Sequence, residues 1–237
     1  MNPFFLKDFM KQSGNAFFLI LIAVALFAAL SYALSQSGRT SGGNASQDTN
    51  RVNASQLTQY PVSLKTAIMR MTTQGAIGVE DVIFNSPSDF GALTDPEKAV
   101  AVFYPTGGGA PYAKAPAEIM ANGAAGTWKF NSENEVAGVG SDGATAGVDT
   151  ESADVTAFLS GVTQAVCESM HTKLGLGAIP TIAAAVNITD EQNATTTGIA
   201  GHGTGAVLTD AVLDRSPYGC FQKPASTYVY YHVLIER

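Results

Sequence analysis

Charge is scarce in this sequence. Only 14% of the 237 residues are charged, whereas a soluble globular protein usually carries about a quarter. The 13 Lys and Arg are outnumbered by 20 Asp and Glu, for a net charge of −7. No basic cluster is present to neutralise phosphates, so nucleic acid is not expected as a partner. With 2 Cys, the chain can be neither a disulfide-dense miniprotein nor a four-Cys zinc protein.

The motifs of common enzyme classes are also missing. The sequence contains no G-x-S-x-G, H-E-x-x-H or Walker pattern. Two glycine-rich runs, Thr106–Gly109 and Gly201–Gly205, lack the preceding strand and the following helix that a phosphate-binding loop needs. Surface turns explain these runs better. We therefore predict neither an enzyme nor a cofactor.

The most prominent feature that is present is an apolar run without charge, Ala16–Leu34. As a helix rising about 1.5 Å per residue, it matches the roughly 30 Å hydrocarbon core of a bilayer and predicts a transmembrane helix over residues 15–35. Lys7 and Lys11 precede it, so residues 1–14 form a short basic leader on the cytoplasmic side. This predicts a protein that crosses a bacterial inner membrane once, with a periplasmic or extracellular C-terminal domain.

The same apolar run leaves a second interpretation open, a cleaved secretory signal. Ala33-Leu34-Ser35 has the small-x-small form that a signal peptidase accepts. The apolar core of such a signal normally runs for about 7 to 15 residues. Because this run is longer, a retained anchor is favoured over a removed signal.

A basic leader that ends in glycine, followed by a long apolar helix and a globular domain, resembles the N terminus of type IV pilins and type II secretion pseudopilins. The residues that carry the resemblance are Lys11–Gly14 and then Asn15–Ile22. It implies cleavage after Gly14, a mature N terminus at Asn15 and assembly with other pilin-like subunits through the N-terminal helix. The family's usual Glu at the fifth mature position is Leu19 here, so its charge pair with a neighbour's terminal amine is missing. A plain signal anchor is the alternative.

The remainder of the chain predicts a linker and one exported domain. Residues 36–50 are rich in Ser, Gly and Asn, which favours a flexible linker, and residues 51–237 form the domain. Early in the domain, apolar residues recur at the spacing of one helix face, which we expect to cover the domain's own sheet. Pro61 lies within this pattern and predicts either a kink or a helix from near Pro61 to Gly75. The apolar positions are Leu57, Tyr60, Leu64, Ile68 and Met71.

The rest of the domain predicts an α+β fold with an antiparallel sheet. Residues 154–174 carry apolar positions at helical spacing, with Gly175 as a stop. The final segment, 227–235, is rich in Tyr and Val on both faces, so both faces of this strand are expected to be covered. Four shorter strands are predicted to form a meander before the helix. They are residues 79–84, 99–104, 127–131 and 135–139.

The two cysteines, Cys167 and Cys220, are predicted to form a disulfide, because thiols in an exported compartment are usually paired. Their placement resembles the C-terminal disulfide loop of many pilins. Two buried free thiols are the alternative. His171 lies four residues after Cys167, and a metal site of these two residues with His202, His232 or Cys220 is the less favoured interpretation, since zinc sites usually take three or four protein ligands. We predict no metal site.

An acidic segment precedes the predicted helix at 154–174. It contains Asp142, Asp149, Glu151 and Asp154, and some pseudopilins bind calcium in such a loop. The spacing of an EF-hand is absent. A solvated loop that leads into the helix, with Asp154 or Thr156 near the helix start, is therefore favoured over a calcium site.

These observations predict a structural protein, a pilin-like or pseudopilin-like subunit of an envelope filament or secretion assembly. The alternative is a signal-anchored periplasmic or extracellular binding module with no filament role, which would contact its ligand through the glycine-rich loops. An anchored hydrolase has no catalytic constellation to support it.

Overall fold

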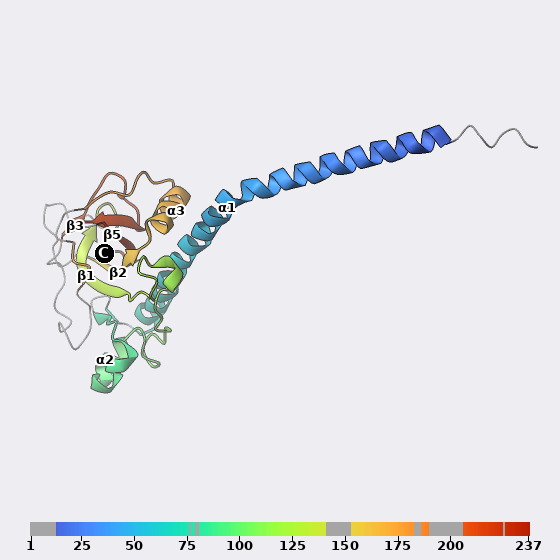
Figure 1. The fold of residues 1–237 in the computed structure, drawn as a ribbon. Helices are drawn as coiled ribbons and strands as arrows, with labels where there is room; N and C mark the ends of the chain where they lie inside the picture. Colours follow the sequence, from blue (N-terminus) through green and yellow to red (C-terminus); the bar gives the residue numbers. More distant parts are fainter. Residues whose placement is uncertain are drawn as a thin grey trace, which may run out of the picture. The chain divides into compact units, whose positions relative to one another are not determined.

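The structure is a computed structural model of the whole chain (Figure 1). It describes residues 13–75, 77–78, 81–140, 153–182, 186–189, 206–224 and 226–237, and within the first range it describes the side chains of 17–33 and 46–75. The chain divides into two units, Met1–Asp48 and Thr49–Arg237. The sheet and its surrounding elements belong to the second unit.

The first helix, α1 (Ser13–Gly75), ends where the sequence predicted. It is continuous through residues 36–50, the segment that we interpreted as a linker from its Gly and Ser content, and it does not begin at Pro61. Proline removes one backbone donor from a helix, but Pro61 is buried here.

The predicted transmembrane helix over residues 15–35 requires a correction. The apolar residues 17–33 are only the N-terminal part of α1, which runs on without a break into Ser-, Gln- and Asn-rich sequence. In the part of the chain that the structure describes, no helix is both long enough and apolar enough to cross a membrane.

The second unit is α+β, with one curled five-stranded mixed sheet in the order β3-β1-β2-β5-β4. Neighbouring strands are antiparallel except β3, which runs parallel to β1. The predicted antiparallel meander is therefore wrong in its order and in its edge strand. The strands are β1 (Lys129–Val136), β2 (Asp154–Val162), β3 (Val207–Leu208), β4 (Tyr218–Lys223) and β5 (Thr227–Ile235).

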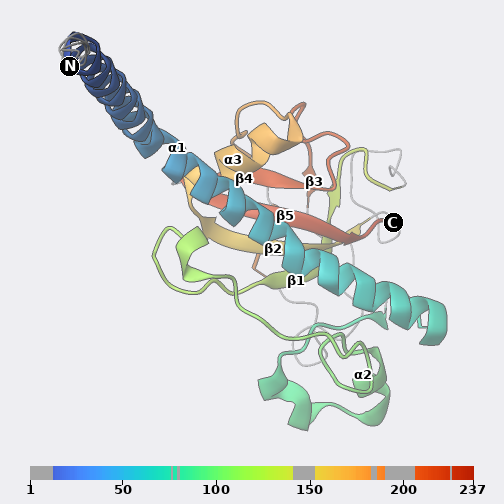
Figure 2. The ribbon, with the colours of Figure 1, turned by 90° about the vertical axis from the view of Figure 1, so that its right-hand side faces the viewer.

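Both faces of the sheet are covered, as expected for its last strand. On one face, the second half of α1 and the helix α3 (Gln164–Leu174) pack on the central strands (Figure 2). The buried residues of α1 include Leu57, Leu64 and Ile68, at the predicted helical spacing. The opposite face is covered by side chains from residues 176–182, 186–188 and 206–213. α1 is therefore an integral part of the domain core.

The predicted helix over 154–174 is half correct. Residues 154–162 form β2, and only residues from Gln164 onward are helical. β2 pairs with β1 on one side and β5 on the other, so its backbone bonds are satisfied across strands. Gly175 ends α3 in the left-handed conformation, with φ of 70°, as the predicted stop.

The early strands were predicted less well. In place of the two strands predicted at 79–84 and 99–104, the described residues form one isolated parallel bridge, between Ile83 and Ala101. Residues 79 and 80 lie outside the described part. A capping box formed by Thr94 and Glu97 starts a helix here instead. The short helices of this region are η2 (Pro87–Ala92), α2 (Asp95–Val100) and η3 (Ala117–Ile119).

Two other predicted strands, 127–131 and 135–139, merge into β1. The polar residues between them resemble a turn in sequence, but they form a bulge within the strand, between Asn131 and Asn134. Asn134 is fully buried and exchanges hydrogen bonds with the backbone of Asn187. Hydrogen bonds with the half-buried Asn187 thus keep this polar stretch in the sheet.

Candidate functional site

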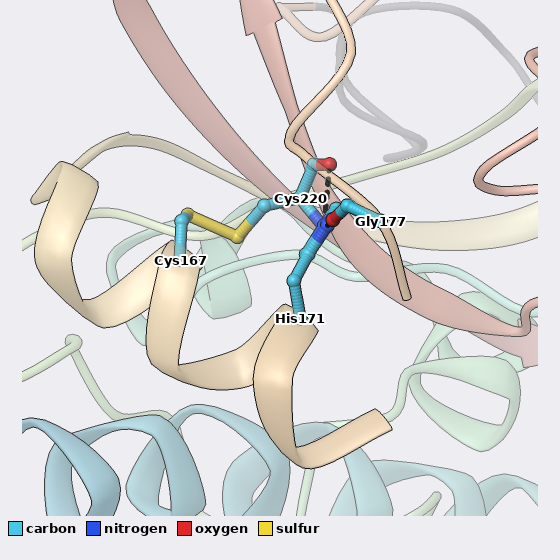
Figure 3. The surroundings of a disulfide bond; sticks show 4 residues. All are labelled: Cys167, His171, Gly177 and Cys220. Carbon is cyan, nitrogen blue, oxygen red and sulfur yellow. Dashed lines mark hydrogen bonds between the residues drawn. A yellow bond between two sulfur atoms is a disulfide. The ribbon is translucent and has the colours of Figure 1, made fainter. Parts of the chain in front are cut away.

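The predicted disulfide is present. Cys167 on α3 and Cys220 on β4 are bonded, with their Cα atoms 5.7 Å apart and both side chains buried (Figure 3). The bond connects the helix layer to the edge of the sheet, and the two cysteines are 53 residues apart in sequence. The alternative of two free thiols is therefore excluded.

His171 lies one turn after Cys167 and contacts the other end of the same bridge (Figure 3). Its Nδ1 lies 2.9 Å from the carbonyl oxygen of Gly177, and its Nε2 lies 2.9 Å from the carbonyl oxygen and 3.1 Å from the backbone nitrogen of Cys220. Both ring nitrogens are thus engaged with backbone, and His171 holds α3 against β4.

Of the other two histidines of the less favoured metal site, the structure describes only His232, on β5. His202 lies outside the described residues, and Nδ1 of His232 lies 2.7 Å from the hydroxyl of Tyr230. Burial lowers the pKa of His232 to about 4, and the charge of Lys65 contributes. Within the described part of the chain, no three His, Cys, Asp or Glu side chains gather as metal ligands would.

Of the acidic segment, only Asp154 is described; Asp142, Asp149 and Glu151 lie outside the described residues. Asp154 belongs to β2 rather than to a helix start. Its carboxylate accepts hydrogen bonds from the N–H groups of Val136, at 2.9 Å, and Arg237, at 3.1 Å. Burial raises its pKa to about 7, against the effect of these bonds. Asp154 thus joins β1 and the C terminus to β2.

Of the two glycine-rich runs, the structure describes only Thr106–Gly109. Gly201–Gly205 lies outside the described residues. Gly107 and Gly108 form a tight turn, in which a Cβ on Gly108 would lie 2.3 Å from the carbonyl oxygen of Val102. The guanidinium of Arg70 donates to the Gly108 carbonyl. This turn packs closely against its own chain.

The predicted processing residues, Gly14 and Asn15, lie in the first turn of α1; their side chains are outside the described part. The helix that follows exposes an uncharged, largely apolar surface, which we call the apolar segment (residues 17–33). Phe27, for example, is 71% exposed. The large exposed side chains are Phe17, Phe18, Leu19, Ile20, Leu21, Ile22, Val24, Leu26, Phe27, Leu30 and Tyr32.

Sequence reasoning missed a cavity of about 730 Å³ in the second unit, beside α1. We call it the α1 cavity. Three parts of the chain line it: one face of α1, the loop that leads into η3, and the residue before β1. The lining residues are Asn53, Gln56, Gln59, Tyr60, Ser63, Ala113, Lys114, Ala115, Pro116, Glu118, Ile119 and Trp128.

Two aromatic residues in this lining carry donors without acceptors. The ring centroids of Tyr60 and Trp128 are 5.5 Å apart. Trp128 is 5% exposed, and its indole N–H is buried without a hydrogen-bond partner among the described residues. The Tyr60 oxygen accepts a bond of 3.2 Å from the N–H of Ala113, which leaves its own O–H without an acceptor in that part of the chain. The polar face of α1, rich in Asn and Gln, was the only signal for this site in the sequence.

No protein-family model, curated protein or solved structure matches this chain. The features that bear on function are the apolar segment, the disulfide region and the α1 cavity.

Proposed function

We propose that the chain is a structural, pilin-like or pseudopilin-like subunit of an envelope filament or secretion assembly. The observation that carries the proposal is the contrast between the two parts of α1. Residues of its second half, such as Leu57 and Leu64, are buried in the core of the domain, whereas the apolar segment is exposed on all sides of the helix. One helix thus both belongs to the domain and presents apolar surface to a partner.

The exposed apolar segment is expected to be buried against a partner. Burying a large apolar side chain is worth about 1.5–3 kcal/mol, and contiguous apolar surface of this kind marks an interaction site. We assign the cover to the same segment of other copies of the chain, packed as a helical bundle. Leu19 fits this assignment, because an apolar residue in place of the family's Glu adds packing surface without a buried charge.

The disulfide supports a location outside the cytoplasm. Stable disulfides form in the periplasm and in extracellular space, whereas cytosolic thiols are kept reduced. The bond between Cys167 and Cys220 is fully buried, with both side chains 0% exposed. We therefore place the second unit in the periplasm or outside the cell, where a pilin-like domain functions.

The first experiment is the mass of the mature protein, purified from cells that carry the prepilin-processing machinery. A chain that begins at Asn15 supports the proposal, because it requires cleavage after Gly14. An intact leader, or a chain that begins at Gln36, contradicts it. The first of these two outcomes leaves an unprocessed chain, and the second a secreted domain.

The second experiment tests assembly directly with single introduced cysteines and a thiol-specific crosslinker in intact cells. Phe27→Cys places a thiol in the apolar segment, and Met69→Cys provides a matched control, an exposed apolar position on the domain part of the same helix. The native cysteines are paired and do not react. We expect a ladder of oligomers for Phe27→Cys and monomers for the control. Monomers for both would refute the subunit role and leave a monomeric binding module.

A further inference from the structure

β4 forms one edge of the sheet, and its outer side is a surface on which another chain can pair. In the described part of the chain, β4 pairs with a single named strand, β5. Its other side presents backbone N–H and C=O groups, among them those of Cys220 and Gln222. Such groups on an edge strand are a template for a strand of another molecule. The residues that bind them therefore decide whether copies of the chain can join at β4.

The sequence of β4 does not protect this edge. Many proteins place charged residues or proline in an edge strand, which prevents a second strand from pairing with it. The stretch Tyr218–Gln222 contains neither, and Lys223 is the last residue of the strand. Its aromatic residues, Tyr218 and Phe221, are of the type enriched in strands. Protection of the edge must therefore come from other parts of the chain.

His171 occupies the middle of this edge (Figure 3). Its Nε2 lies 2.9 Å from the carbonyl oxygen and 3.1 Å from the backbone nitrogen of Cys220. These are the two groups that a neighbouring strand would bind. Its Nδ1 lies 2.9 Å from the carbonyl oxygen of Gly177. One side chain thus blocks the edge at Cys220 and holds the start of the segment that follows α3.

That segment, which we call the strap (residues 177–182), blocks the next position of the edge. The N–H of Gln222 donates to the carbonyl oxygen of Pro180 at 2.8 Å, and the carbonyl oxygen of Gln222 accepts from the N–H of Ile182 at 2.9 Å. The two bonds form an isolated parallel bridge between Thr181 and Gln222. His171 and the strap together bind the outward groups of Cys220 and Gln222.

We propose that His171 and the strap prevent β4 from pairing with the β4 strand of a second copy of the chain. Two antiparallel β4 strands are self-complementary, because a two-fold axis at Cys220 places Tyr218 of each opposite Gln222 of the other. Lys223, the one charged residue of β4, lies outside this paired stretch. The inference does not depend on the subunit role, because β4 belongs to the second unit and the apolar segment to the first.

Hydrogen exchange of the β4 amides, measured by mass spectrometry at several protein concentrations, tests the proposal on the full-length protein. Exchange within residues 218–223 of the wild type should not depend on concentration. In His171→Ala, we expect it to slow about tenfold as the concentration rises, which corresponds to strand pairing worth about 1.4 kcal/mol. Ile182→Pro is a second variant that keeps His171 and removes the strap's N–H bond to Gln222. It should show the same dependence, and it keeps the test decisive if His171→Ala does not fold.

Two control variants separate pairing at β4 from a general loss of stability. Leu64→Ala destabilises the core from α1, and Thr172→Ala changes an exposed neighbour of His171 on α3. In both controls, exchange within β4 should be independent of concentration. Concentration-independent exchange in the folded His171→Ala and Ile182→Pro variants would overturn the proposal. The same concentration dependence in Leu64→Ala would also overturn it.

The outcome is separate from that of the crosslinking experiment. Crosslinking at Phe27→Cys reports on the apolar segment, whereas exchange within residues 218–223 reports on β4. Monomers in the first experiment together with pairing in the second would refute the subunit role and support the block at β4. Oligomers in the first together with concentration-independent exchange in the second would refute the block alone.

Discussion

Loss of the disulfide is the most informative perturbation of the domain. The bond between Cys167 and Cys220 connects α3 to β4 across the two layers (Figure 3). The bond can be removed by reduction, or by the double substitution of both cysteines by alanine. In either case His171 still binds the backbone of Cys220, so the native contact between helix and strand is retained.

The size of the effect follows from the unfolded chain. The two cysteines are 53 residues apart, and for a closed loop of that length the chain-entropy relation gives about 14 cal/mol/K, or about 4 kcal/mol at 25 °C. The folded state keeps its packing around His171. Removal of the bond therefore acts mainly by raising the conformational entropy of the unfolded chain. We therefore expect the free energy of unfolding to decrease by about 3–4 kcal/mol.

Urea unfolding, followed by circular dichroism with and without reductant, measures this difference. The wild-type protein should lose stability when reduced, and the double alanine variant should be as unstable without reductant as with it. The variant is also the control for any direct effect of the reductant. A loss below about 1 kcal/mol would refute the reasoning, because it would mean that other contacts already restrict the unfolded loop.

Three further predictions concern packing, a buried hydrogen bond and pH. Leu64→Ala removes a fully buried side chain of α1 and should cost about 2–5 kcal/mol in urea unfolding, whereas the exposed Met69→Ala should change stability by less than about 0.5 kcal/mol. His171→Ala leaves the backbone groups that its ring binds without partners and should cost about 1–3 kcal/mol, with faster hydrogen exchange in α3; unchanged exchange would contradict this role. Burial raises the pKa of Asp154 from 3.8 to about 7 and lowers that of His232 from 6.5 to about 4. The folded carboxyl binds more protons than the unfolded one, so it makes stability decrease as pH rises from 4 to 7, while the histidine makes it increase between pH 4 and 6.5. The stability of Asp154→Asn should therefore rise more steeply than that of the wild type between pH 4 and 6.5, and parallel curves would exclude this account.

Some elements of the domain were predictable because their signal is local. The buried positions of α1 between Leu57 and Met71 recur at helical spacing, and Gly175 carries the conformation that ends α3. The last strand, β5, is rich in Tyr and Val on both faces, and it is buried on both faces. Each of these patterns lies within a few neighbouring residues.

Other elements were misread because burial on two faces removes the pattern that distinguishes strand from helix. In β2, the residues Asp154–Leu159 are all buried, so apolar positions at helical spacing coexist with an extended backbone. The capping box of Thr94 and Glu97 gave a local signal for α2 that the Val-rich sequence after it obscured. The bulge at Asn131 and Asn134 resembles a turn until its partner Asn187 is known.

The amino-acid sequence by itself determined the apolar stripe of α1, the terminal strand and the pairing of the only two cysteines, because side-chain spacing and composition are properties of short segments. Only the tertiary structure decided that residues 154–162 are a strand, that β3 runs parallel to β1, and that Tyr60 meets Trp128 beside a cavity. The physical reason is that a strand finds its hydrogen-bond partners, and a cavity its walls, in parts of the chain that are distant in sequence.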